Sequence, residues 1–86
     1  MLNSIAENGV IYLRGIIAPI ISIAPVIIFK IDERGILLSV NIDKEDMGRI
    51  IGKGGETAKA IRRLVRQFAS INNAHIAVKI NEPENS

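Results

Sequence analysis

A loop of four residues, Gly52-Lys53-Gly54-Gly55, carries the clearest chemical signal in the sequence. Glycine has no Cβ, so a ligand can approach the main chain of this loop closely. The residues from Glu56 onward predict a helix, and its free N–H groups and positive dipole end would point into the same space. Lys53 adds a mobile positive charge. Together these features favour contact with a phosphate.

Two familiar phosphate-binding loops do not fit this spacing. A nucleotide-binding P-loop has the pattern G-x-x-x-x-G-K-[ST]. Here Gly48 stands one residue too close to Gly52-Lys53, and Gly54 follows the lysine. A dinucleotide-binding loop joins a strand to a helix, whereas this loop joins two predicted helices. What remains is a helix-GxxG-helix pattern, which clamps about four nucleotides of backbone in KH modules. A glycine-rich turn between helices that binds nothing is the simpler alternative.

The positive charge of the chain is concentrated around this loop. The net charge of the whole chain is only +2. Between Lys44 and Arg66, however, seven basic residues accompany three acidic ones, and the rest of the chain is slightly acidic. A local basic stretch of this kind attracts phosphates.

Basic residues also form a stripe on the helix predicted after the loop. The four that recur at helical spacing are Lys59, Arg62, Arg63 and Arg66. The stripe either borders a nucleic-acid groove or is an ordinary solvated helix face. Lys59 and Arg62 are nearest to the loop. We therefore include them in the predicted RNA-binding site, together with Arg49 and Ile51 on the other side of the loop.

No residues in the sequence form a catalytic or metal-binding set. The chain has no cysteine, so neither a disulfide nor a thiolate metal site is possible. His75 is the only histidine, and a lone histidine without clustered carboxylates is not a metal site. Asp43, Glu45 and Asp46 are explained by capping and by the helix dipole. The sequence therefore predicts a non-catalytic protein with no metal, no cofactor and no small-molecule substrate.

The N-terminal half predicts one helix and two strands. Apolar residues recur at helical spacing from Val10 to Ile20, which favours a helix over about residues 5–21. Pro19 should kink this helix or end it early. A β-branched run predicts a strand over 26–31, and a turn over 32–35 leads to a second strand over 36–42. Alternation places four residues of the second strand on one face: Ile36, Leu38, Val40 and Ile42.

The C-terminal half predicts two helices and one strand. Asp43 should cap a short helix that ends at Ile51. A longer helix over 56–70 has an apolar stripe made of Ile61, Leu64, Val65 and Phe68. A strand over 75–80 and a polar tail over 81–86 complete the chain. The order α-β-β-α-α-β predicts an α+β two-layer sandwich, with a three-stranded sheet covered on one face by three helices. We expect a single domain over residues 1–86, with its core at about 26–80.

The uncharged run from Gly15 to Phe29 is the one candidate for a membrane or export segment. It is shorter than the ~20 residues of a spanning helix, and two prolines interrupt it. No clearly basic region precedes it, as a signal peptide would require. We interpret the run as a buried helix followed by a buried strand. With no cysteine in the chain, a cytoplasmic location is expected.

Aromatic side chains are too few for a base-stacking platform. Phe68 falls in a core stripe and Phe29 in the apolar run, so neither is expected to be free to stack on bases. An aliphatic groove between the loop-flanking helices and the second strand is the alternative, as in KH domains. Its candidate walls are Ile50, Ile51, Leu38 and Val40, although core packing is the simpler role for most of them.

The segment from Asp43 to Arg62 resembles the small bacterial single-KH-domain proteins of the KhpA family, and the resemblance extends more loosely over residues 26–80. It implies a type II KH domain that binds single-stranded RNA through residues 52–55. It also implies a homodimer, or a heterodimer with a second KH protein. The family role would be that of an RNA chaperone or post-transcriptional regulator linked to cell envelope and division control. Pro19 departs from the charged amphipathic first helix expected in this family.

Two alternatives remain open at this point. The chain could be a protein-interaction or dimerisation module that docks on a ribosomal or regulatory partner. Ile28 and Leu37, expected on the open face of the sheet, support that alternative. The ligand could also be single-stranded DNA, because nothing in the sequence identifies a contact to a 2′-hydroxyl.

Overall fold

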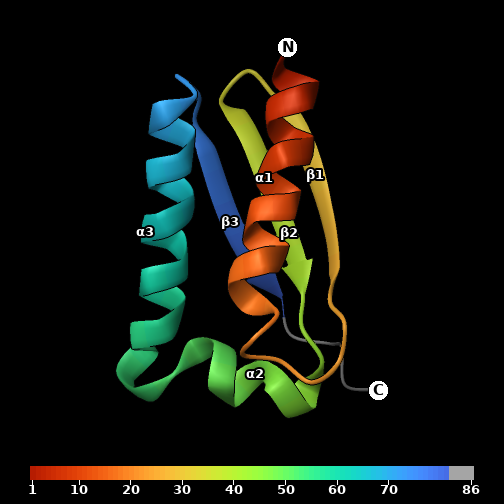
Figure 1. Ribbon diagram of the computed structural model, residues 1–86, viewed down its shortest axis with the longest axis vertical. Coiled ribbons are helices and arrows are strands. Elements are labelled where there is room, and N and C mark those ends of the chain that lie inside the picture. The colour runs from red at the N-terminus through yellow and green to blue at the C-terminus, as the bar shows by residue number, and fades with distance from the viewer. Residues whose placement is uncertain (82–86) are drawn as a thin grey trace.

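The computed structural model describes residues 1–81 and shows a layer of helices on one face of a three-stranded sheet (Figure 1). The elements in chain order are α1 (Leu2–Ile17), β1 (Val26–Asp32), β2 (Gly35–Asn41), α2 (Lys44–Ile51), the 3-10 turn η1 (Lys53–Gly55), α3 (Glu56–Ile71) and β3 (Ile76–Asn81). This order confirms the predicted α+β sandwich with type II KH topology. Residues 82–86, most of the predicted polar tail, lie outside the described residues.

The sheet has the order β1-β2-β3, so β2 is its central strand. β1 and β2 form an antiparallel hairpin in which Asp32 pairs with Gly35. β2 and β3 are parallel, in register from the Ile36–Ile76 pair to the Asn41–Asn81 pair. A parallel pair needs a crossover connection, and α2 with α3 provides it. β3 therefore forms an edge of the sheet beside α3.

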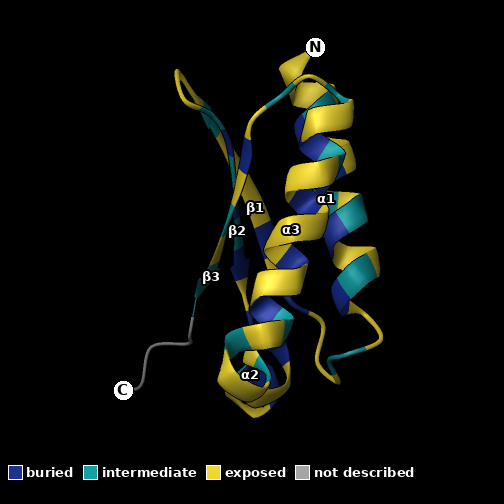
Figure 2. Cartoon of the chain, turned by 90° about the vertical axis from the view of Figure 1, so that its left-hand side faces the viewer, coloured by how far each residue is buried: buried dark blue, intermediate teal, exposed yellow. Residues whose placement is uncertain are grey.

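The core lies between the sheet and the helices α1 and α3 (Figure 2). Alternate residues of β2 are buried there, as the sequence predicts for Ile36, Leu38 and Val40. The buried residues that the helices contribute are Ala6, Leu13 and Ile17 from α1, Met47 and Ile50 from α2, and Ala58, Ile61, Val65 and Ala69 from α3. Tyr12 and Phe68 stack with their ring centroids 4.9 Å apart and join α1 to α3.

The first helix begins and ends earlier than the sequence predicts. It spans Leu2–Ile17 rather than about 5–21. The N–H of its C-cap Ala18 donates to the Arg14 carbonyl, and the Ile20 and Ile21 N–H groups donate to the Ile17 carbonyl in the turn that follows. Pro19 follows Ala18 and has no N–H to continue the ladder. Pro19 therefore accounts for the early end of α1. Residues 18–25 form a separate connection from α1 to β1.

The prediction that β1 is a buried strand is wrong. Val26 and Ile28 are about 60% exposed, and Phe29 is 36% exposed. Val26 and Ile28 pair with Asn41 and Ser39 on the face of the sheet opposite the helices, and β1 is an edge strand with only one neighbour. On α3, Leu64 is also exposed, whereas Ala58 and Ala69 complete the buried stripe. The last strand extends to Asn81, which the sequence assigned to the tail.

Candidate nucleic-acid interface

The glycine loop lies at the end of the molecule where α2 turns into α3 (Figure 1). The Asp43 carboxylate caps α2, because its Oδ1 accepts the Glu45 N–H at 3.0 Å. The helix ends where the Gly52 N–H donates to the Gly48 carbonyl at 2.9 Å. The Gly55 N–H then donates to the Gly52 carbonyl at 3.1 Å and closes the turn. The capped helix α2 therefore fixes the position at which the loop begins.

Gly52, the first glycine of the loop, is packed against the chain itself. Its φ of 73° lies in the region that L side chains rarely adopt. A Cβ at this position would overlap the Thr57 hydroxyl and would lie 2.9 Å from the Thr57 nitrogen. Gly52 therefore allows α2 and the start of α3 to approach each other. Its contacts are with the protein, not with open space.

The other three loop residues face solvent. Lys53 and Gly54 are exposed, and Lys53 makes no ion pair within residues 1–81. A Cβ placed on Gly54 or Gly55 would meet nothing within 4 Å. Behind them, α3 begins at Glu56, and its N-cap Gly55 provides no side-chain cap, so its first N–H groups are not satisfied by a neighbouring side chain. The arrangement leaves an open space in front of a positive helix end.

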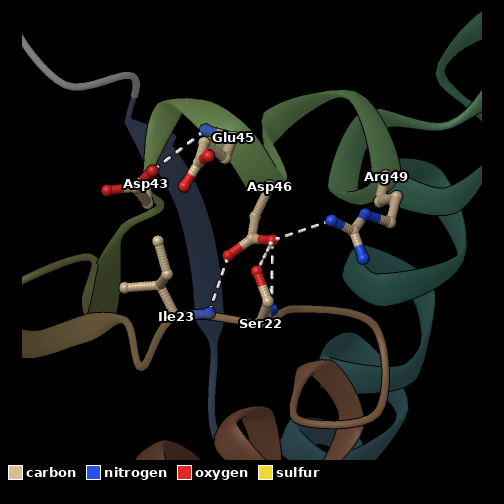
Figure 3. Close-up of polar contacts among 6 residues, drawn as sticks. All are labelled: Ser22, Ile23, Asp43, Glu45, Asp46 and Arg49. Carbon is tan, nitrogen blue, oxygen red and sulfur yellow. Dashed lines mark hydrogen bonds and ion pairs between the residues drawn. The ribbon is translucent and has the colours of Figure 1, made fainter.

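Asp46 has a different role from the one that the sequence predicts. Its carboxylate is fully buried and holds the connection between α1 and β1 (Figure 3). Ser22 donates its N–H to Oδ1 at 3.0 Å and its hydroxyl to the same oxygen at 2.9 Å. The Ile23 N–H donates to Oδ2 at 3.0 Å. The prediction that Asp46 serves helix capping is therefore wrong, and Asp43 alone is the cap.

Arg49 is also held by this cluster. Its Nη2 lies 3.4 Å from Asp46 Oδ1, and its side chain remains 60% exposed (Figure 3). Burial raises the pKa of Asp46, but the N–H groups of Ser22 and Ile23, the Ser22 hydroxyl and the Arg49 guanidinium outweigh it. The pKa therefore lies below its usual 3.8. The ionised carboxylate orients Arg49 on the same helix as the loop, one turn before Gly52.

The remaining predicted site residues lie on the two helices that flank the loop. Ile51 is 39% exposed at the end of α2, and Lys59 and Arg62 are exposed on α3. Arg62 Nε reaches the Val78 carbonyl at 3.4 Å, so its side chain extends from α3 to β3. Apart from Gly52, the predicted set therefore forms an exposed region around the loop.

The predicted groove walls need correction. Ile50, Leu38 and Val40 are buried in the core, so they cannot touch bases. The sequence placed the second strand beside the loop-flanking helices, but that strand, β2, is central. The strand next to α3 at the sheet edge is β3. Any groove beside the loop is therefore bordered by β3, with Val78 half-buried there.

Comparison with known proteins places the chain in a family. Residues 12–80 match the family described as KhpA/KhpB, KH domain. The chain belongs to this family. No solved structure matched the chain.

Several KhpA proteins resemble this chain over part of its length. The protein named RNA-binding protein KhpA from Listeria monocytogenes is 51% identical over 43 residues, which cover 50% of this chain and 57% of the relative. Its namesake from Clostridium perfringens is 44% identical over 48 residues, covering 56% and 64%. That from Leifsonia xyli is 40% identical over 52 residues, covering 60% and 68%. The matches thus span between 57% and 68% of each relative's length.

The described residues offer little support for a metal site or for a membrane-spanning helix. Residues 1–81 contain no group of three side chains that could hold a metal ion. His75 is exposed just before β3, as alternation predicts. None of the helices within these residues is long and apolar enough to cross a membrane.

Proposed function

We propose that this KH domain binds single-stranded RNA through the loop at residues 52–55 and catalyses no reaction. The observation that carries the proposal is the open space in front of Gly54 and Gly55, behind which α3 begins without a side-chain cap. An extended strand can lie on this backbone with its phosphates against the helix N-terminus. The relatives named RNA-binding proteins support the choice of ligand.

The side chains around the loop fit this ligand. Lys53 is the nearest free cation, and Arg49 is held one turn before the loop by Asp46. Lys59 and Arg62 extend the positive charge along α3 toward β3. Ile51 supplies an exposed apolar contact next to Gly52. In this proposal the backbone phosphates determine affinity, and the edge of β3 contacts the bases.

The decisive experiment replaces the open part of the loop by negative charge. The variant Lys53→Asp/Gly54→Asp should lose RNA binding at least tenfold, because two carboxylates would face the phosphates. The matched control is Arg14→Asp/Gly15→Asp, another exposed basic-glycine pair, with open space at Gly15. Circular dichroism checks that both variants fold. Equal RNA affinity of the folded loop variant and the control would refute the proposed site.

The same binding assay separates RNA from DNA. Single-stranded RNA, single-stranded DNA of the same sequence and duplex RNA are titrated in parallel at one salt concentration, because phosphate binding depends on salt. Preference for single-stranded RNA is expected. Equal binding of the single-stranded DNA would make the protein a general single-strand binder. A cytoplasmic location and a role as RNA chaperone or post-transcriptional regulator, linked to cell envelope and division control, rest on the family resemblance.

The structure also favours self-association as a second function. β1 is an edge strand with exposed apolar residues Val26, Ile28 and Phe29, and such edges pair readily with another strand. Ile28→Asp should therefore lower the mass measured by sedimentation, whereas Ile11→Asp, on exposed α1 surface, should not. If neither variant changes the mass of an associating protein, β1 is not the interface.

A further inference from the structure

A second concave region lies at the opposite end of α3 from the glycine loop. It is a cleft of about 740 Å³. Three segments that are distant in sequence line it. They are the β1–β2 hairpin with Asp32 and Arg34, the last turns of α3 with Arg66, and the turn before β3 with Asn73 and His75. The Ile36 N–H bonds to the His75 carbonyl at 2.9 Å and holds the hairpin against that turn.

The charges in this cleft favour an anion. Arg34 and Arg66 are both exposed, and neither forms an ion pair with a carboxylate in residues 1–81. Asp32 is the one acidic residue in the lining, and its Oδ1 accepts the Arg34 N–H at 2.8 Å. Two guanidinium groups with one carboxylate leave a net positive charge. Planar guanidinium groups bind phosphate oxygens through paired hydrogen bonds.

The cleft and the proposed RNA site lie at opposite ends of the basic stripe on α3. α3 has 16 residues and is therefore about 24 Å long. Its exposed basic residues continue from Lys59 near the loop through Arg62 and Arg63 to Arg66 in the cleft. Arg62 lies between the two ends and reaches over to the Val78 carbonyl of β3. A strand held at Gly54 would follow this positive stripe toward Arg66.

We propose that the cleft at Arg34 and Arg66 is a second binding site for backbone phosphates of the same single-stranded RNA. This inference rests on the proposed function and extends it. A KH loop clamps about four nucleotides. The second site binds phosphates beyond that segment, so the protein holds a longer RNA than its loop alone.

The test compares two RNA lengths with two double variants. The RNAs are an oligouridine of about four nucleotides, the length that a KH loop clamps, and one about three times as long. The cleft variant is Arg34→Ala/Arg66→Ala. The control is Arg14→Ala/Lys30→Ala, which removes the same charge from α1 and β1 at residues that do not line the cleft. All four substituted positions are exposed, and thermal unfolding confirms that the variants keep the fold.

The expected result is a loss that depends on RNA length. The cleft variant should bind the long RNA about tenfold more weakly than the wild type, because two phosphate contacts are missing, and should bind the short RNA normally. The control should retain the wild-type gain in affinity with length. Equal affinity of both variants for the long RNA would overturn the second site, as would an equal loss for both lengths in the cleft variant. Wild-type protein that binds neither RNA would instead overturn the proposed function itself.

Discussion

The two halves of the glycine loop differ in what they face. Gly52 packs against Thr57 of the same chain, so its missing side chain serves the fold. Gly54 and Gly55 have no atom within 4 Å of an added Cβ, so their missing side chains leave room for a ligand. Gly52 and Gly54 have similar φ angles of 73° and 62°, so the backbone conformation alone does not distinguish them. The contacts show that one loop combines a position packed against the fold with an open position, which is where the proposed ligand would lie.

The largest effect is expected at Gly52. Gly52→Ala should lower the free energy of unfolding by about 3 kcal/mol, because the new methyl group overlaps Thr57 and the φ of 73° becomes strained. Urea denaturation measures this loss. The double variant Gly52→Ala/Thr57→Ala should recover only part of it, since the Thr57 nitrogen remains 2.9 Å from the added Cβ. A Gly52→Ala protein as stable as the wild type would contradict the structural role of this glycine.

The second effect concerns the buried Asp46 carboxylate, which ties the connection between α1 and β1 to α2, the helix that leads into the loop. Asp46→Asn should lower the melting temperature at neutral pH. The asparagine oxygen can accept a hydrogen bond from Ser22 or from Ile23, but the amide nitrogen cannot accept the other one, so a buried N–H group loses its partner. The folded pKa of Asp46 is below its usual 3.8. Its ionised form therefore stabilises the fold above about pH 4, and this contribution is lost as the pH falls through the folded pKa.

The difference in melting temperature between Asp46→Asn and the wild type should consequently shrink as the pH is lowered from 4 toward 2. Asp43→Asn is the matched control, because asparagine still caps a helix and the change should cost little. A gap for Asp46→Asn that stays constant over this pH range would show that the stabilisation does not come from the ionised carboxylate.

The smallest effect on stability is expected at Gly54. Gly54→Ala should cost only about 1 kcal/mol, because the φ of 62° is mildly unfavourable for alanine but the methyl group meets no atom. Its RNA affinity should fall more clearly than its stability, since the methyl group occupies the space proposed for the ligand. Denaturation and RNA titration of the same sample test both statements. A stability loss as large as that of Gly52→Ala would remove the distinction between the two glycines.

Local patterns in the sequence predict most of the fold and the place of the loop. The cap at Asp43, the alternation along β2 and the glycine cluster all depend on neighbours within a few residues, and each is found in the structure. The role of Asp46 depends instead on Ser22, 24 positions away. Glu45 has the same charge and also lies in the first turn of α2. Local patterning therefore could not tell which of the two carboxylates is buried.

Strand order explains the remaining differences. The β-branched run of β1 is as apolar as a central strand, but Ile28 faces the side of the sheet opposite the helices, and Phe29 is exposed at the sheet edge. The parallel pairing of β2 with β3 depends on the crossover of α2 and α3, and no short segment encodes it. The candidate base-contacting groove was consequently placed against β2, whose residues Leu38 and Val40 are buried. The cleft at Arg34 and Arg66 joins residues from three elements, so no sequence motif could reveal it.

The hydrogen bonds between Asp46 and the connection over residues 18–25 also limit how two copies can associate. Exchange of a terminal helix between protomers needs a hinge that can open. Here the middle of the hinge is fastened to α2 at Ser22 and Ile23, which leaves only short free segments on either side. The first helix should therefore stay with its own chain, so that any association of two copies is expected to use surface contacts between complete folds without domain swapping.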